Sequence, residues 1–260
     1  MKLLVGGDPH GNIDLINKYV QDEEAKGNDI KAVLVAGDMG MFYENDGTPM
    51  PKNHQEKGNF YEYLNGTKSF NVPVFTVAGN HDNYDLVSEL WPKADNKQPD
   101  LQVPNLYVLM NGEIAMSALY NENMELKESI KIGALGGIYS PIKFENDFNN
   151  GSNRKFFTRN QYNKLLEGEC DILLMHDLVS GERSKGRVYF SDEMWKIFHT
   201  LKPKYTIVGH FHWTSFFRLN LDINTQMAFI MLPMLQSGYL VLDTETWDAV
   251  GTRFDKYEIN

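Results

Sequence analysis

Short apolar segments that end in turn residues recur along the chain. They are about five to eight residues long and rich in Val, Ile and Leu, which favours buried β-strands over helices. These segments begin at Lys2, Ala32, Val72, Ile130, Asp171 and Tyr205. A helix is predicted between the first two, over residues 13–26, because Ile13, Ile16 and Val20 recur at helical spacing and Gly27 follows. The chain therefore opens with a βαβ unit.

The second half changes character. Apolar runs from Tyr107, Met227 and Tyr239 predict further strands without long helices between them. A purely parallel sheet needs a long crossover between its strands, so this pattern favours mixed sheets. We expect the final forty or so residues to be strands that close a second sheet. Three segments have no assigned element, residues 41–60, 140–159 and 179–190, and long irregular loops of this kind are often functional.

Polar motifs follow five of the predicted strands directly. The motifs are Asp8-Pro9-His10-Gly11-Asn12, Gly37-Asp38-Met39-Gly40, Gly79-Asn80-His81-Asp82, His176-Asp177 and Gly209-His210-Phe211-His212. They contain five of the seven histidines of the chain. In open α/β sheets, ligands bind outside the carboxyl ends of the strands. We therefore expect the five motifs to converge on one crevice.

The residue types in these motifs suit divalent metal ions. Carboxylate oxygens and imidazole nitrogens are the usual ligands of Mn, Fe, Zn, Co and Ni. Asp8 and His10 stand two residues apart, as do His210 and His212, so both members of each pair can turn toward one ion. Asp38 has two carboxylate oxygens and can bridge two ions, the arrangement used in two-metal catalysis.

Taken in order, the motifs resemble the signature of the calcineurin-like metallophosphoesterases: D-x-H, G-D, G-N-H-D/E, a lone His and G-H-x-H. The resemblance runs from Asp8 to His212. It implies an α/β fold, a four-layer αββα sandwich of two mixed β-sheets flanked by helices, with two divalent ions at one edge. It also implies the ligands of each ion. One ion would take Asp8, His10, Asp38 and His212, and the other Asn80, His176 and His210, with Asp38 shared.

The resemblance also assigns the reaction. In such enzymes two metal ions activate water for in-line attack on phosphorus. His81 would donate a proton to the leaving alkoxide or steady the phosphoryl oxygens, and Asp82 would orient His81 from behind. For substrate contacts we expect Asn12, Arg154 and Arg159.

For two groups of residues, a role in the surface or the core remains open beside a role in substrate binding. The basic residues near Arg154 and Arg159 also fit a solvated surface. Phe42, Tyr43, Phe60 and Tyr61 could stack on bases or simply pack in the core.

Two branches of the superfamily can be compared more closely. The second half, with GGIYSP, DILLMHD and KYTIVGHFHWTSFF, looks like the RNA lariat debranching enzymes, which cleave 2'-5' phosphodiester bonds. That branch typically has Cys where this chain has Asp8, and Asp8 restores the ordinary two-metal pattern. Ser/Thr protein phosphatases instead carry G-D-x-x-D-R-G, whereas this chain reads GDMGMFY. The missing arginine disfavours that activity.

Composition adds limits. The chain has 260 residues, 42% of them hydrophobic, which suits one domain over residues 1–260 with a large core. A net charge of −10 argues against a surface built mainly to coat nucleic acid, but not against a nucleotide or RNA substrate.

The single cysteine, Cys170, excludes an intrachain disulfide and fits a buried side chain. Neither a signal peptide nor a transmembrane span is recognisable, so we expect no membrane partner and a cytoplasmic location.

Three functions compete. The first is a phosphodiesterase that hydrolyses a nucleotide or nucleic-acid phosphodiester. The second is a phosphomonoesterase acting on a small phosphorylated metabolite. The third is a protein-binding scaffold without catalysis, which the intact motifs disfavour. The substrate, the identity of the metals and the oligomeric state are left open.

Overall fold

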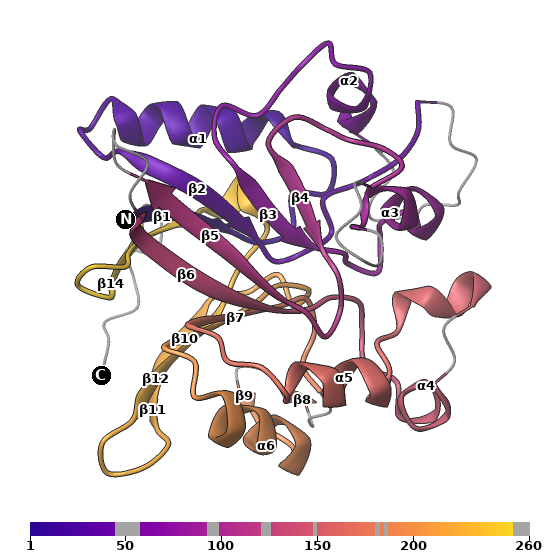
Figure 1. The fold of residues 1–260 in the computed structure, drawn as a ribbon, viewed down its shortest axis with the longest axis vertical. Helices are drawn as coiled ribbons and strands as arrows, with labels where there is room; N and C mark the ends of the chain where they lie inside the picture. The colour runs from indigo at the N-terminus through magenta and orange to yellow at the C-terminus, as the bar shows by residue number, and fades with distance from the viewer. Residues whose placement is uncertain are drawn as a thin grey trace.

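A computed structural model describes residues 1–44, 58–92, 99–120, 126–147, 150–179, 183–184 and 187–251. Two six-stranded sheets lie face to face, with helices on their outer faces (Figure 1). The first sheet has the order β14-β13-β1-β2-β3-β4 and the second the order β11-β12-β10-β7-β6-β5. Both sheets are mixed, as predicted. In the first, β1 to β4 are parallel; in the second, β12, β10, β7 and β6 are parallel.

The elements have the following bounds. Strands of the first sheet are β1 (Lys2–Gly6), β2 (Ile30–Val35), β3 (Val74–Val77), β4 (Leu106–Leu109), β13 (Leu240–Asp243) and β14 (Asp248–Gly251). Strands of the second are β5 (Ile114–Tyr120), β6 (Leu126–Leu135), β7 (Ile172–Met175), β10 (Tyr205–Val208), β11 (Ser215–Asn220) and β12 (Gln226–Met231). A separate two-stranded sheet pairs β8 (Arg183–Ser184) antiparallel with β9 (Arg187–Val188). The helices are α1 (Asp14–Glu24), α2 (Phe60–Leu64), α3 (Tyr84–Leu90), α4 (Pro141–Asn146), α5 (Arg159–Leu165) and α6 (Asp192–Leu201), with short 3-10 turns η2 (Gly151–Lys155) and η3 (Leu235–Ser237).

Three apolar layers hold this sandwich together, and alternation along the strands builds them. In β1, Leu3 faces the second sheet while Leu4 packs with Ile16 of α1. In β7, Leu174 lies between the sheets and Leu173 packs against the outer helices. Because successive side chains of a strand point to opposite faces, a strand covered on both sides reads as a continuous apolar run. The predicted four-layer αββα sandwich is confirmed.

Two strand predictions were wrong in detail. The run from Tyr107 is not one strand, because it divides into β4 and β5, which belong to different sheets. The chain turns between them at Gly112, whose φ is +80°. The prediction for the final forty or so residues is right only for β12, which lies in the second sheet. The last two strands, β13 and β14, instead extend the first sheet, and β13 pairs antiparallel with β1. Without β13, the apolar strand β1 would be an exposed edge.

The three unassigned segments contain some regular structure. Residues 140–159 include α4 and η2, and residues 179–190 include β8 and β9. Most of the segment 41–60, residues 45–57, lies outside the described residues. Cys170 is buried, as expected.

Candidate metal centre

The predicted ligands lie where the carboxyl ends of strands from both sheets meet. Asp8 and His10 follow β1, Asp38 follows β2, and Asn80 follows β3 in the first sheet. His176 follows β7, and the pair His210 and His212 follows β10, in the second. Backbone hydrogen bonds join the loops, because the His10 amide donates to the Asp38 carbonyl at 2.9 Å and the Gly11 amide to the Met39 carbonyl at 3.0 Å. The motifs therefore converge, although they are far apart in sequence.

One group of ligand atoms contains His10, Asp38 and His212, all within 4.8 Å of one another. His10 Nε2 lies 2.9 Å from His212 Nε2 and 3.8 Å from Asp38 Oδ2. Asp8 Oδ2 lies 3.8 Å from His212 Nε2 and belongs beside this group. Ligand atoms that share one ion at roughly 2 Å are about 3 to 4 Å apart. The spacing therefore fits one divalent ion held by the four predicted residues.

A second group contains Asp38, His176 and His210. His176 Nδ1 donates to the Ala36 carbonyl at 2.8 Å, so in the neutral ring Nε2 carries a lone pair. That lone pair lies 3.1 Å from Asn80 Oδ1 and 3.5 Å from Asp38 Oδ2, which are also acceptors. A divalent cation between these three acceptors would satisfy all of them at once. Since Asp38 belongs to both groups, it stands where a bridging ligand would.

The two buried carboxylates each leave one oxygen available. Asp8 Oδ1 accepts the His210 backbone amide at 3.0 Å, and Asp38 Oδ1 accepts the His81 amide at 2.8 Å. Within the described part of the chain, Asp8 Oδ2 and Asp38 Oδ2 are buried without a hydrogen-bond partner. A buried carboxylate oxygen without a partner is costly, and a bound cation removes that cost. The residues present therefore fit a dinuclear metal centre.

Burial shifts the protonation of this cluster in the absence of ions. Burial, followed by the charge of Asp38, holds the pKa of Asp8 well above its ordinary value. Burial also raises the pKa of Asp38 to about 7 and, together with Asp38, that of Asp82 to about 6. The pKa of His176 is lowered, chiefly by burial. A neutral imidazole beside carboxylates that resist ionisation is a site that divalent charge would stabilise.

The ligand loops are held in an uncommon backbone conformation. His10, Asp38, His210 and His212 have φ values of 45°, 47°, 63° and 57°. Such left-handed residues cost of order 1 kcal/mol each and persist where the surroundings impose them. Gly79 shows how tight these surroundings are, because a Cβ there would lie 2.0 Å from Asp38 Oδ1. The loops are therefore shaped around the ligands.

The predicted catalytic residues lie beside the first ligand group. The ring of His81 meets that of His10 edge to face, with centroids 5.5 Å apart. Asp82 is buried and contacts backbone amides: Oδ1 accepts from Gly40 at 2.8 Å and Met41 at 2.9 Å, and Oδ2 from Gly79 at 2.8 Å. Asp82 therefore ties the loop after β2 to the loop after β3.

The predicted substrate contacts are more scattered. Asn12 is exposed, and its side-chain amide donates to the Pro9 carbonyl at 3.2 Å. Arg154 pairs with Asp85 of α3 and donates to the Tyr84 carbonyl at 3.0 Å, which ties η2 to α3. Arg159 pairs with Glu145 and covers the ring of Phe144 at 4.5 Å. A substrate phosphate would have to compete with these carboxylates for either guanidinium.

Sequence reasoning missed the backbone groups that support the site. The Ala36 carbonyl fixes the tautomer of His176, although the two residues are 140 positions apart. The amides of Gly40 and Met41 hold Asp82. The one available signal was the glycine content of the motifs, since glycine lets two backbones approach closely.

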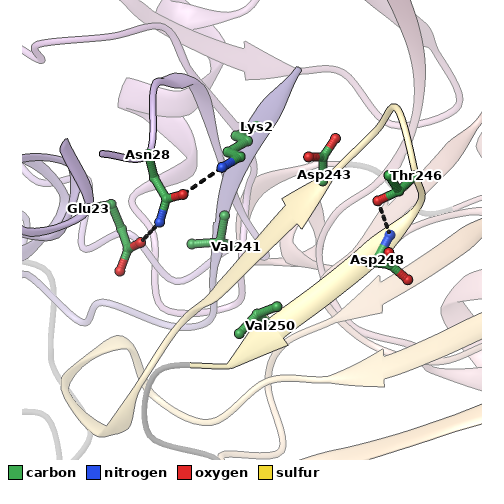
Figure 2. Close-up of a pocket in the computed structure, with 8 residues that line it drawn as sticks. All are labelled: Lys2, Glu23, Asn28, Val241, Asp243, Thr246, Asp248 and Val250. Atoms are coloured by element: carbon green, nitrogen blue, oxygen red, sulfur yellow. Dashed lines mark hydrogen bonds between the residues drawn. The ribbon is translucent and has the colours of Figure 1, made fainter. Parts of the chain in front are cut away.

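A separate pocket of about 290 Å³ lies at the other end of the first sheet. Figure 2 shows its lining residues, Lys2, Glu23, Asn28, Val241, Asp243, Thr246, Asp248 and Val250. Lys2 Nζ donates to Asn28 Oδ1 at 2.6 Å, and Asn28 Nδ2 donates to Glu23 Oε2 at 2.5 Å. Lys2 begins β1, whereas Asp8 follows its end, so this pocket is not part of the metal centre.

The model of the calcineurin-like phosphoesterase family matches residues 1–214. The chain belongs to the calcineurin-like phosphoesterase family. Among curated proteins it is similar to the lariat debranching enzyme of Arabidopsis thaliana, with 23% identity over 82% of this chain and 54% of the relative. The lariat debranching enzyme of Entamoeba histolytica is also 23% identical, over 96% of this chain and 79% of the relative. The chain thus spans about half the length of the first of these phosphoesterase relatives.

Among solved structures, a protein from Thermus thermophilus superimposes with a TM-score of 0.54 at 13% identity, over 97% of this chain and 98% of the other. This likeness shows that the two chains share a fold. In the described part of the chain, every helix is too short or too polar to cross a bilayer.

Proposed function

We propose that this chain is a metal-dependent phosphodiesterase that hydrolyses a nucleotide or nucleic-acid phosphodiester. The observation that carries the proposal is the pair of ligand groups that share Asp38, with the unpartnered oxygens of Asp8 and Asp38 beside their imidazoles. When bound, two divalent ions supply Lewis acidity: they lower the pKa of water and neutralise charge on the phosphoryl group. Mn, Fe, Zn, Ni and Co all suit this donor set.

The protein residues bind the ions and donate a proton. His10, His212 and Asp8 would hold one ion, and Asn80, His176 and His210 the other, with Asp38 shared between them. His81 stands beside His10 and is suited to donate a proton to the leaving alkoxide, since an imidazole can do so near neutral pH.

Asp82 acts as a positioning residue in this proposal. Its two oxygens fix the loops that carry Asp38 and His81, and the His81 amide in turn donates to Asp38. Asp82 would therefore orient His81 through the backbone.

The choice of a diester rests on the relatives. Both curated relatives are lariat debranching enzymes, at 23% identity. Asp8 stands where the lariat debranching enzymes typically have Cys, so we propose an ordinary two-metal phosphodiesterase. The assay below decides whether it cleaves a 2'-5' or a 3'-5' bond. A chain of net charge −10 suits a short nucleic acid or a nucleotide better than a long duplex.

The test compares bis(p-nitrophenyl) phosphate with p-nitrophenyl phosphate, using protein stripped of metal and refilled with Mn. We expect the diester to be hydrolysed faster and Asp38→Ala to be inactive. His81→Ala should lose roughly a hundredfold or more on a dinucleotide, whose alkoxide needs a proton, and much less on the nitrophenyl ester, whose leaving group does not. Parallel 2'-5'- and 3'-5'-linked dinucleotides identify the linkage.

Other outcomes would assign another function. Faster hydrolysis of the monoester would favour the phosphomonoesterase. If neither nitrophenyl ester nor either dinucleotide reacts while two ions are bound per chain, the catalytic proposal is wrong and a scaffold role replaces it.

A further inference from the structure

Three aromatic rings lead from the metal centre toward solvent along residues 210–213. The ring of His210 lies 5.3 Å from that of Phe211, and Phe211 lies 5.4 Å from Trp213. Phe211 is partly buried and packs against the apolar layer between the second sheet and its helices. Trp213 is 38% exposed. An indole that contacts a partly buried ring is thus open to solvent one residue after the predicted ligand His212.

The backbone around Trp213 is held in place at both ends. The Gly209 amide donates to the Met175 carbonyl at 3.4 Å, and β11 begins at Ser215, only two residues after Trp213. Between these anchors, His210 and His212 have left-handed φ values. A side chain held on so short a connection loses little conformational freedom when a ligand covers it, which favours binding.

Several other aromatic side chains near the site pack within the protein. Phe42 and Phe60 are buried, so of the two alternatives left open for them core packing applies. Tyr139 packs against the rings of Phe144 and Phe157, with centroids 5.3 and 5.9 Å away. Among the exposed large apolar side chains in the described ranges, Trp213 is the one that adjoins a predicted metal ligand.

A nucleotide places its base beside the phosphate, because the sugar separates the two. A ring that receives the base is therefore expected beside the ions and not over them, and Trp213 directly follows the predicted ligand His212. We propose that Trp213 stacks on the base of a nucleoside that is esterified to the scissile phosphate. Trp213 would thereby select nucleotide phosphodiesters over simple alkyl phosphodiesters. This inference rests on the proposed phosphodiesterase function and names the residue that sets its specificity.

The test uses two diesters with the same leaving group, thymidine 5'-(p-nitrophenyl phosphate) and methyl p-nitrophenyl phosphate, on the Mn-loaded protein. Trp213→Ala should lower kcat/KM for the thymidine ester roughly tenfold, mainly through KM, and leave the methyl ester unchanged. Trp213→Phe should retain most of the preference. The matched control is Tyr107→Ala, which removes an exposed ring that packs against a phenylalanine, Phe75, with centroids 5.0 Å apart, far from the predicted ligands in sequence.

Two kinetic results would overturn the inference. Equal losses on both esters would mean that Trp213 supports the ligand loop, and no loss on either would mean that it contacts no base. If the wild-type protein cleaves neither ester, the proposed phosphodiesterase function is wrong, and these kinetics do not test the stacking. Binding then decides the inference: by calorimetry, Trp213→Ala should weaken thymidine 5'-monophosphate and not inorganic phosphate, and unchanged nucleotide affinity would refute stacking.

Discussion

Removal of the divalent ions should make the stability of the folded protein fall as the pH rises. Asp8, Asp38 and Asp82 are all buried in one cluster. Without ions, burial and mutual repulsion disfavour their charged forms, and the pKa of Asp38 rises to about 7. The perturbation is chelation of the metal, followed by thermal unfolding at a series of pH values.

The sign and size of this pH effect follow from the number of protons that the folded and unfolded states bind. The unfolded pKa of Asp38 is 3.8 and the folded one about 7. Between these values the folded state binds more protons than the unfolded state, so the free energy of unfolding decreases as pH rises and levels off above pH 7. A shift of about three units corresponds to about 4 kcal/mol. About two thirds of this is lost between pH 5 and pH 7, which for a chain of this size is a fall in Tm of roughly 5 to 11 °C.

The assay compares melting curves of chelated and Mn-loaded protein from about pH 5 to pH 8. We expect the stabilisation by Mn to grow with pH, because the ions replace the protons that the carboxylates otherwise need. Asp38→Asn should flatten the pH dependence of the metal-free protein and raise its Tm at pH 8. Asp29→Asn, at a carboxylate that is 74% exposed, is the matched control and should change neither.

One result would refute this reasoning. If metal-free wild-type protein is as stable at pH 8 as at pH 5, and Asp38→Asn does not stabilise it, then the buried carboxylates do not oppose folding. The case for a metal centre built on their unpartnered oxygens would then lose its physical basis.

Three further outcomes are expected. Gly79→Ala should lower kcat by roughly a hundredfold while the circular dichroism spectrum is retained, because the added methyl displaces Asp38; Gly66→Ala, where a Cβ meets nothing within 4 Å, should stay active. Asp82→Asn should lower the free energy of unfolding of the Mn-loaded protein by about 2 kcal/mol in denaturant titrations, since the amide cannot accept all three backbone hydrogen bonds. Cys170 should react with a thiol reagent at pH 8 only after unfolding, because burial raises its pKa to about 12; rapid labelling of the native protein would contradict its burial.

Much of the architecture could be predicted because it has local signatures. Buried strands read as apolar runs, so the six main strands and α1 lie close to where the spacing put them. The run from Tyr107 shows the limit, since its two halves enter different sheets. The apolar pattern of β13 likewise did not reveal that it pairs with β1. Side-chain periodicity shows that a strand is buried, but it does not show which strand lies beside it.

The candidate site also has features that the sequence determines and features that depend on the tertiary structure. The sequence alone determined which residues gather, because Asp8, Asp38 and His210 each follow a strand and the carboxyl ends of parallel strands share one edge. Only the tertiary structure decided how these groups are held. The tautomer of His176 depends on the distant Ala36 carbonyl, and Phe211 packs against the outer apolar layer while Trp213 is exposed. The physical reason is that strand position is encoded within a few residues, whereas burial and hydrogen-bond partners depend on groups brought together from both sheets.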